Sequence, residues 1–238
     1  LRVESGGDVG DTYSYAAPPR DRIRSFDGPV VTRVLAAGPL VAALEVNGRM
    51  RVSTGLVGVS TVLSLHDGSP ALRVTLEVDN QASDHRLRLR FPTGLPGGSA
   101  VAGSAFGATE RPVVRYEPGR YPREAPVATA PAQRFVAHAG SRRGLAIFAP
   151  GFFEYELSEE GDLLVTVLRA VGELSRSDLA TRPGHAGWPT ATPEAQCRGV
   201  ERMQFAVCPV RSPAVAGGTT LPTIWEDLFL PPRAIWLR

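Results

Sequence analysis

Apolar and polar residues alternate with a period of two along much of the chain, which is the pattern of a β-strand with one face on a core. Residues 71–79 are the clearest case. Residues 86–91 repeat the pattern, with Arg86, Arg88 and Arg90 between apolar residues. The turn-forming residues that separate these stretches indicate two antiparallel neighbours. We therefore expect the arginine row to face water, near acidic residues of an adjacent strand.

The same reasoning predicts strands along most of the chain. No segment shows a sustained apolar stripe at helical spacing. The other predicted strands are residues 30–35, 40–46, 49–65, 144–148, 152–157, 163–171, 200–210, 224–230 and 234–237. This pattern predicts an all-β protein, a large two-sheet antiparallel sandwich that forms a single domain over residues 1–238.

Two long stretches, residues 92–131 and 172–199, lack a strand pattern and are expected to be irregular loops. Long irregular connections in a compact domain are usually functional or disordered. The second stretch holds Trp188 and many polar side chains, and residues 4–18 combine aspartates with tyrosines. Carboxylate, guanidinium and aromatic groups are the types that hold a sugar, so both segments are candidates for ligand contact.

The composition excludes several classes of protein. All 26 basic residues are arginine, which we interpret as codon bias of a GC-rich bacterial genome. A net charge of +2, with arginine interleaved among acidic residues, argues against a nucleic-acid partner. No apolar run approaches the roughly 18 residues of a membrane span, and no signal peptide pattern is present. We expect a cytoplasmic protein, and the opening at Leu1 suggests a fragment of a larger one.

The residues that carry chemistry form no self-contained catalytic or metal site. The histidines show no metal-ligand spacing, and two cysteines are too few for a Cys-rich zinc site. Neither a nucleophile elbow nor a phosphate-binding loop with a lysine is present. These patterns therefore give no support for a self-contained zinc site, a Ser-His-Asp hydrolase or a phosphate-binding site. The residues considered are His66, His85, His138, His185, Cys197 and Cys208.

Four collinear segments resemble motifs of bacterial family 38 α-mannosidases. Residues 7–18, GDVGDTYSYAAP, resemble the element G-D-x-G-D-x-Y-x-[FY]-x-P. Residues 85–93 look like the strand H-R-L-R-x-x-F-P-T, and residues 163–172 look like L-x-L-T-L-L-R-A-V-G. Residues 174–199 resemble L-S-R…R-x-G-x-A-G…T-P-E-A-Q-C-x-G. Each motif is modest by itself, but four in order cover most of the chain.

The resemblance implies a supersandwich of the galactose-mutarotase kind and the family's activity, zinc-dependent retaining hydrolysis of terminal α-mannosides. In this family the nucleophile and the zinc ligands lie on an N-terminal α/β domain that this chain lacks. The chain would then be catalytically inactive alone, with that domain as its partner and an α-mannoside as substrate.

The resemblance also implies the site residues. Tyr13 corresponds to a family tyrosine, and Arg182 to a family arginine, that reach the active site from the β-domain. These two residues are expected to bind substrate, with Asp11 and Arg176 in support.

Two other functions remain open from the sequence. The first is a stand-alone carbohydrate-binding module or lectin of sandwich fold. The second is a mutarotase-like epimerase, which needs a histidine and a glutamate facing each other on a concave sheet; His66, His138 and Glu154 are the candidates.

Overall fold

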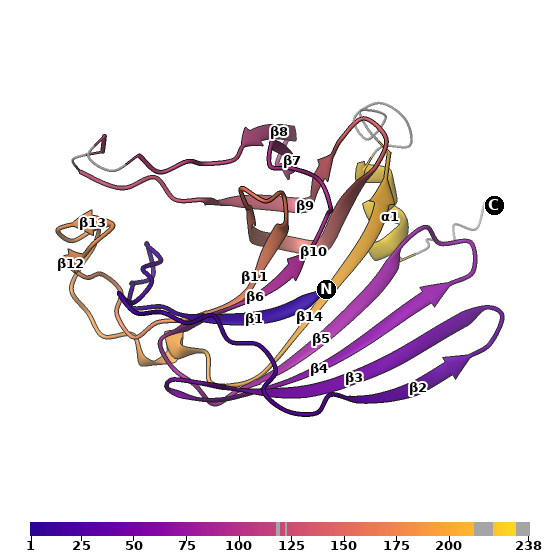
Figure 1. The fold of residues 1–238 in the computed structure, drawn as a ribbon, viewed down its shortest axis with the longest axis horizontal. Coiled ribbons are helices and arrows are strands. Elements are labelled where there is room, and N and C mark those ends of the chain that lie inside the picture. The colour runs from indigo at the N-terminus through magenta and orange to yellow at the C-terminus, as the bar shows by residue number, and fades with distance from the viewer. Residues whose placement is uncertain (118–119, 122, 212–220, 232–238) are drawn as a thin grey trace, which may run out of the picture.

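A computed structural model describes residues 1–117, 120–121, 123–211 and 221–231, and it is nearly all β-structure (Figure 1). The prediction of an all-β protein is therefore confirmed. The strands of the main sheet are β1 (Arg2–Gly7), β2 (Val31–Ala37), β3 (Val41–Val52), β4 (Gly55–His66), β5 (Leu72–Asn80), β6 (His85–Phe91), β7 (Ser99–Ser104), β8 (Gly107–Pro112), β9 (Thr129–Ala139), β10 (Gly144–Leu157), β11 (Leu163–Ala170) and β14 (Gly199–Val210). The smaller elements are β12 (Asp178–Leu179), β13 (Arg182–Pro183), the 3₁₀ turn η1 (Pro193–Gln196) and the helix α1 (Leu221–Phe229).

The strands form one large antiparallel sheet in the order β1-β6-β11-β10-β14-β5-β4-β3-β2, and β9, β7 and β8 branch from β10. The sheet curls so that its two halves face each other, as in a β-sandwich (Figure 1). The main core lies between the halves, with Val3, Leu87 and Leu89 from one side and Val74 and Leu76 from the other. Every second residue of these strands is buried, because alternate side chains point into the core.

The expected pairing of residues 71–79 with residues 86–91 is wrong. β5 pairs with β4 and β14, whereas β6 pairs with β1 and β11. The short connection that contains Asp84, whose φ is 50°, leads from one half of the sheet to the other, so the apolar faces of β5 and β6 belong to the same core without sharing hydrogen bonds. The alternating pattern requires only that the apolar face of a strand meets another apolar face. Two strands in opposite halves of the sheet satisfy this requirement as well as two hydrogen-bonded neighbours do.

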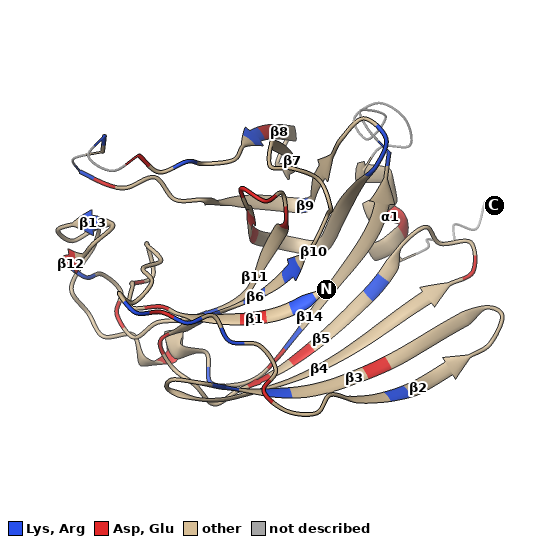
Figure 2. Ribbon diagram, viewed as in Figure 1, with Lys and Arg blue, Asp and Glu red and all other residues tan. Residues whose placement is uncertain are grey.

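The arginine row of β6 is not in water, so that expectation also needs correction. Arg86 is 6% exposed, and Arg88 and Arg90 are largely covered. Arg88 donates hydrogen bonds to Glu4 Oε1 at 2.9 Å and to Glu156 Oε2 at 2.7 Å, and Arg90 also lies 4.0 Å from Glu4. Arginine does meet glutamate as expected, but the acidic partners come from β1 and β10 and the ion pairs are partly buried. Figure 2 shows acidic and basic residues together along β1 and beside β6.

Two further expectations changed. Residues 92–131 were expected to be irregular, but they contain the hairpin β7–β8. Residues 224–230 were expected to form a strand, but the structure has α1 there, because Leu221, Ile224, Trp225 and Leu228 follow helical spacing and cover one end of the sheet. The predicted strand 234–237 lies outside the described residues. Residues 172–199 are largely irregular, as predicted.

Two remaining features bear on chemistry and location. Cys197 and Cys208 are both free thiols, and burial raises the pKa of each. Within the described part of the chain, no helix is long and apolar enough to cross a membrane.

Candidate functional site

The two segments that the sequence singled out leave the sheet at the same place. Gly7, His85 and Ala170 lie side by side at one rung of β1, β6 and β11. The loop of residues 8–30 follows β1, and the loop of residues 171–198 follows β11. Figure 1 shows the indigo loop after β1 close to the orange segment that carries β12 and β13. The fold therefore brings together residues that are about 170 positions apart in the sequence.

Asp11 is the centre of this contact, and its side chain is completely buried. Its Oδ1 accepts hydrogen bonds from the backbone N–H groups of Tyr13 (3.0 Å) and Ser14 (2.8 Å). Its Oδ2 accepts from the backbone N–H of Arg176 (2.8 Å) and from Arg182 Nη2 (2.5 Å). Burial raises the pKa of Asp11, but these hydrogen bonds outweigh it, so the pKa lies below its usual value and Asp11 is ionised at neutral pH.

Arg182 is also buried, with 7% of its surface exposed. Besides Asp11, its guanidinium donates to Ser14 Oγ at 2.7 Å and to the backbone carbonyls of Arg176 and Gly184. These contacts use most of the donors that a guanidinium offers. Arg182 therefore holds the two loops together, and little of its hydrogen-bonding capacity faces solvent.

Tyr13 sits on the surface of the same cluster and is 56% exposed. A Cβ added to Gly187 would lie 2.7 Å from the Tyr13 hydroxyl oxygen, so the tyrosine packs directly against the Gly187 backbone. Ser175 Oγ accepts hydrogen bonds from the N–H groups of Ala186 and Gly187 at 2.9 and 3.1 Å, which fixes this segment. Trp188 follows it and is 81% exposed. The site thus presents aromatic side chains on a polar, hydrogen-bonded base.

Arg176 lies next to the cluster at the surface. Its guanidinium pairs with Asp178 at 2.8 Å, and this ion pair is exposed. The structure therefore brings together all four residues expected at the site: Tyr13, Arg182, Asp11 and Arg176.

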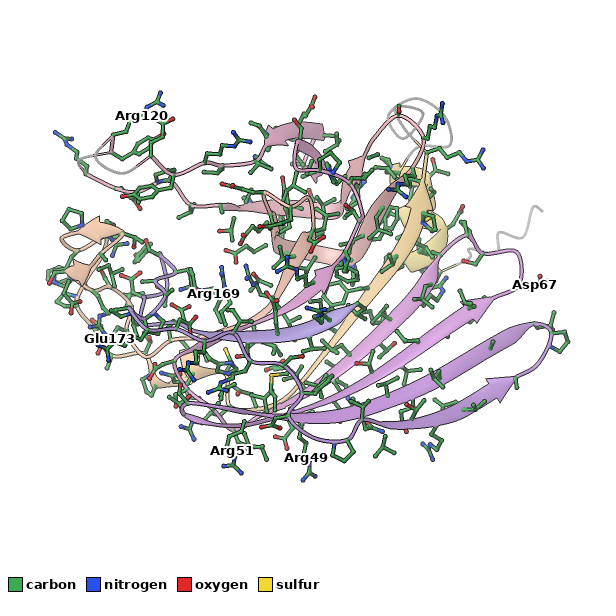
Figure 3. The ribbon with its side chains drawn as sticks, viewed as in Figure 1. Arg49, Arg51, Asp67, Arg120, Arg169 and Glu173 are labelled. Carbon is green, nitrogen blue, oxygen red and sulfur yellow. The ribbon has the colours of Figure 1, made fainter. Side chains whose placement is uncertain are left out.

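A second buried ion pair, which the sequence analysis did not assign, supports the first loop. Asp8 is 1% exposed and lies 2.8 Å from Arg169 Nη2, at the end of β11. Arg169 also donates to the backbone carbonyl of Asp11, and Thr12 Oγ1 donates to the carbonyl of Leu174. Figure 3 labels Arg169 and the neighbouring Glu173, where the second loop leaves the sheet. The repeated Gly-Asp pair at residues 7–8 and 10–11 was the sequence signal that could have identified Asp8. Both aspartates accept hydrogen bonds from backbone N–H groups of the loop.

Tyr15, two residues beyond Tyr13, points inward instead. The Arg86 guanidinium lies 3.5 Å from the centre of its ring, which is a cation–π contact. Burial raises the pKa of Tyr15, although the charge of Arg86 opposes this. Tyr15 thus anchors the loop to β6, while Tyr13 remains available at the surface.

The described residues contain no group of three or more His, Cys, Asp or Glu side chains that could hold a metal ion. The part of the chain that the structure describes therefore does not fit a zinc site. The residues considered for an epimerase do not face each other. The ring nitrogens of His138 contact the backbone carbonyls of Ser99 and Pro96. Glu154 lies opposite Pro131 of β9, which is seven positions from His138 along that strand. His66 lies at the end of β4, and its Nε2 contacts Ser64.

Replacing Gly187 with alanine should displace Tyr13 without unfolding the protein. The added methyl group would overlap the tyrosine hydroxyl, which can move because the side chain is exposed. We expect a change in the free energy of unfolding of at most about 0.5 kcal/mol. NMR contacts between the Tyr13 ring and Gly187 should weaken. Gly151→Ala is the control, because a Cβ there meets nothing within 4 Å; an unmoved Tyr13 in Gly187→Ala would contradict the packing described.

Comparison with known proteins places these features in context. Residues 4–173 match the model of the "Glycosyl hydrolases family 38 C-terminal domain". A curated protein of Halalkalibacterium halodurans, described as a putative mannosylglycerate hydrolase, is 34% identical over 162 residues, which is 68% of this chain and 16% of that protein.

Two solved structures from Enterococcus faecalis share the fold. An alpha-mannosidase of strain V583 superposes with a TM-score of 0.76 and 24% identity over 94% of this chain and 27% of its own. A protein in glycosyl hydrolase family 38 gives a TM-score of 0.74 and 24% identity over 94% and 28%. The chain thus spans less than a third of the length of these relatives.

Proposed function

Because the chain belongs to the glycosyl hydrolase family 38 C-terminal domain family, we propose that it is the β-domain of a larger retaining α-mannosidase. It would supply loop residues to a sugar site whose nucleophile and zinc ligands lie in polypeptide outside residues 1–238. Zinc, when bound there, would hold sugar hydroxyls and help to orient the ring.

The observation that carries the proposal is the cluster around Asp11. It fixes the exposed phenol of Tyr13 beside Gly187, on loops that are joined by a buried ion pair. A rigid support of this kind places a hydroxyl with little loss of conformational freedom on binding. We propose that the Tyr13 hydroxyl contacts a mannosyl hydroxyl. We propose that Arg182 also donates a hydrogen bond to the sugar. One of its two Nη1 hydrogens is used by Ser14 Oγ, and the other is left for a ligand.

In a retaining glycosidase, one carboxylate attacks the anomeric carbon and a second acts first as acid and then as base. Those groups would come from the other part of the enzyme. The residues of this chain would bind and orient the sugar ring from the opposite side. Terminal α-mannosides are the proposed substrate class, and the similarity to the curated relative adds mannosylglycerate as a candidate.

The test compares the isolated chain with the polypeptide encoded together with the sequence upstream of Leu1. We expect no hydrolysis of an aryl α-mannoside or of mannosylglycerate by the isolated chain, and zinc-dependent hydrolysis by the longer protein. NMR of the first product should show the α-anomer, since the mechanism is retaining. Zinc-dependent turnover by the isolated chain, or an upstream region without hydrolase activity, would contradict the proposal.

In the active longer protein, Tyr13→Phe should lower kcat/KM by roughly tenfold, the effect of losing one hydrogen bond to the substrate. The stability should stay within about 0.5 kcal/mol of the wild type, because the hydroxyl is at the surface. Tyr116→Phe is the matched control, since Tyr116 is similarly exposed at 58% but lies in another loop. Equal kcat/KM values for wild type and Tyr13→Phe would remove Tyr13 from the site.

A stand-alone carbohydrate-binding module is the second candidate, and the exposed aromatic residues Tyr13 and Trp188 favour it. Such side chains stack on the apolar face of sugars. Calorimetric titration of the isolated chain with mannose and oligomannosides separates the two functions. Millimolar or tighter binding that is lost in Trp188→Ala favours the module, whereas half of an enzyme site should bind these sugars barely at all.

A further inference from the structure

The inner face of the sheet stays apolar beyond the point where the core covers it. One row of cross-strand neighbours runs from Phe205 on β14 through Val74, Leu63 and Leu44 to Val34 on β2. Phe205 and Val74 are 5% and 1% exposed, Leu63 and Leu44 are half-buried, and Val34 is 66% exposed. The residues become exposed along the row, but they do not become polar.

The next row toward the end of β4 adds Leu65, which is 52% exposed. We call Val34, Leu44, Leu63 and Leu65 the open apolar surface. A strand whose inner face meets water normally carries polar side chains on that face. A contiguous exposed apolar patch instead marks a surface that another polypeptide covers.

The opposite face of the same strands shows the contrast. Arg33 and Glu45 form an ion pair at 3.1 Å there, and Asn47 and Ser60 are neighbours in the sheet. Figure 2 shows few charged residues on β2 to β4. The outer face thus carries an ion pair and polar side chains beside Val31, whereas Val34, Leu44, Leu63 and Leu65 on the inner face are all apolar.

The backbone of β2 adds a second feature. Among the described residues, β2 pairs only with β3, so it forms a free edge of the sheet (Figure 1). An unpaired edge offers N–H and C=O groups to an incoming strand, and the apolar face beside it offers contacts for alternate side chains.

We propose that the open apolar surface and the β2 edge bind a β-strand with apolar residues at alternate positions, from a region of the larger polypeptide outside residues 1–238. The relatives favour this occupant over a second copy of the chain. This chain accounts for 16% of the curated relative and 27% of the solved alpha-mannosidase, so most of their polypeptide lies outside the region that it matches. The inference rests on the proposed place of the chain in a larger protein, but not on its sugar chemistry.

The test uses the 238-residue chain and, as probes, the polypeptides encoded immediately upstream and downstream of it, each purified and added separately. We expect one of them to bind, as measured by calorimetry. Val34→Asp and, independently, Leu65→Asp should weaken that binding at least roughly 30-fold, as expected for central interface residues.

Val31→Asp is the matched control. Val31 lies on the same strand with 62% exposure, but its side chain points to the outer face, so its binding should stay within about threefold of the wild type. Circular dichroism of all three variants should match the wild type, because each replaced side chain is at the surface.

Three outcomes would overturn the inference: neither probe binds, Val31→Asp and Val34→Asp weaken binding equally, or Val34→Asp abolishes a dimer of this chain that sedimentation detects. The last outcome would assign the surface to a second copy. Because binding is measured without substrate, a complex that forms but hydrolyses no mannoside refutes the proposed activity and leaves this inference standing.

Discussion

Replacing Asp11 with asparagine is expected to lower the free energy of unfolding by about 3–5 kcal/mol, the cost of breaking a buried ion pair by removing one partner. The carboxylate accepts hydrogen bonds on both oxygens, from Tyr13, Ser14, Arg176 and Arg182. An amide offers one oxygen, and its NH₂ group would face N–H donors whichever way it turned. The guanidinium of Arg182 would remain buried without its counter-charge. Urea unfolding at neutral pH measures the difference.

Asp178→Asn is the control for this prediction. Asp178 also pairs with an arginine, Arg176, but its side chain is 65% exposed. An exposed ion pair contributes little to stability, so we expect a much smaller loss than in Asp11→Asn. Similar losses in Asp11→Asn and Asp178→Asn would show that the buried cluster does not stabilise the fold. In the longer enzyme that we propose, Asp11→Asn should also lower turnover, because Tyr13 and the loop of residues 171–198 lose their common support.

Acidification from pH 6.5 to about 4 is expected to lower the free energy of unfolding through His85. Burial lowers the pKa of His85 from 6.5 to about 4, although the charge of Asp84 opposes this. Ser5 Oγ lies 2.9 Å from Nδ1, and Nε2 lies 3.0 Å from Asn80 Oδ1. Asn80 is oriented by Ala82 and by the carbonyls of residues 196 and 197, so Nε2 carries the proton and Nδ1 accepts from the serine.

The sign follows from proton binding. Between the two pKa values the unfolded chain binds a proton at this histidine and the folded protein does not, so stability falls as the pH falls. The full contribution is present above pH 6.5 and is lost as the pH approaches about 4. The shift corresponds to about 3 kcal/mol.

Urea unfolding at several pH values tests this prediction. His85→Gln should be less stable at pH 7, because it loses part of the Ser5–His85–Asn80 network, but its stability should fall less steeply between pH 6.5 and 4.5. His66→Gln, which replaces an exposed histidine outside this network, is the control, and the wild-type slope is the reference. If His85→Gln kept that slope, another group would be responsible for the acid sensitivity.

The strands could be predicted from the sequence because alternation reports directly on a half-buried face. Alternation does not report which strand lies beside which, so the pairing of β5 with β6 was wrong although both strands were located correctly. The arginine row of β6 was misplaced for a related reason: its covering partners, Glu4 and Glu156, come from distant segments. The helix α1 was missed because it is a single short amphipathic segment among strands.

The candidate site could be predicted only in part. The G-D-x-G-D element indicated Asp11 and Tyr13, and local geometry explains why, since Asp11 binds the N–H groups of the next residues. The pairing of Asp11 with Arg182 joins residues 171 positions apart, and no local pattern encodes it. Asp8 and Arg169 show the same limit. Resemblance to a family supplied Arg182 and Arg176, whereas spacing alone did not.

The rung formed by Gly7, His85 and Ala170 also has a consequence for evolution and engineering. Both site loops begin there, so their lengths and sequences can vary while the register of β1, β6 and β11 is kept. The ion pairs Asp8–Arg169 and Asp11–Arg182 must then be exchanged together, because each joins one loop to the other loop or to β11. Transplanting both loops together from a relative would therefore keep these ion pairs intact, and transplanting either loop alone would leave a buried charge without its partner.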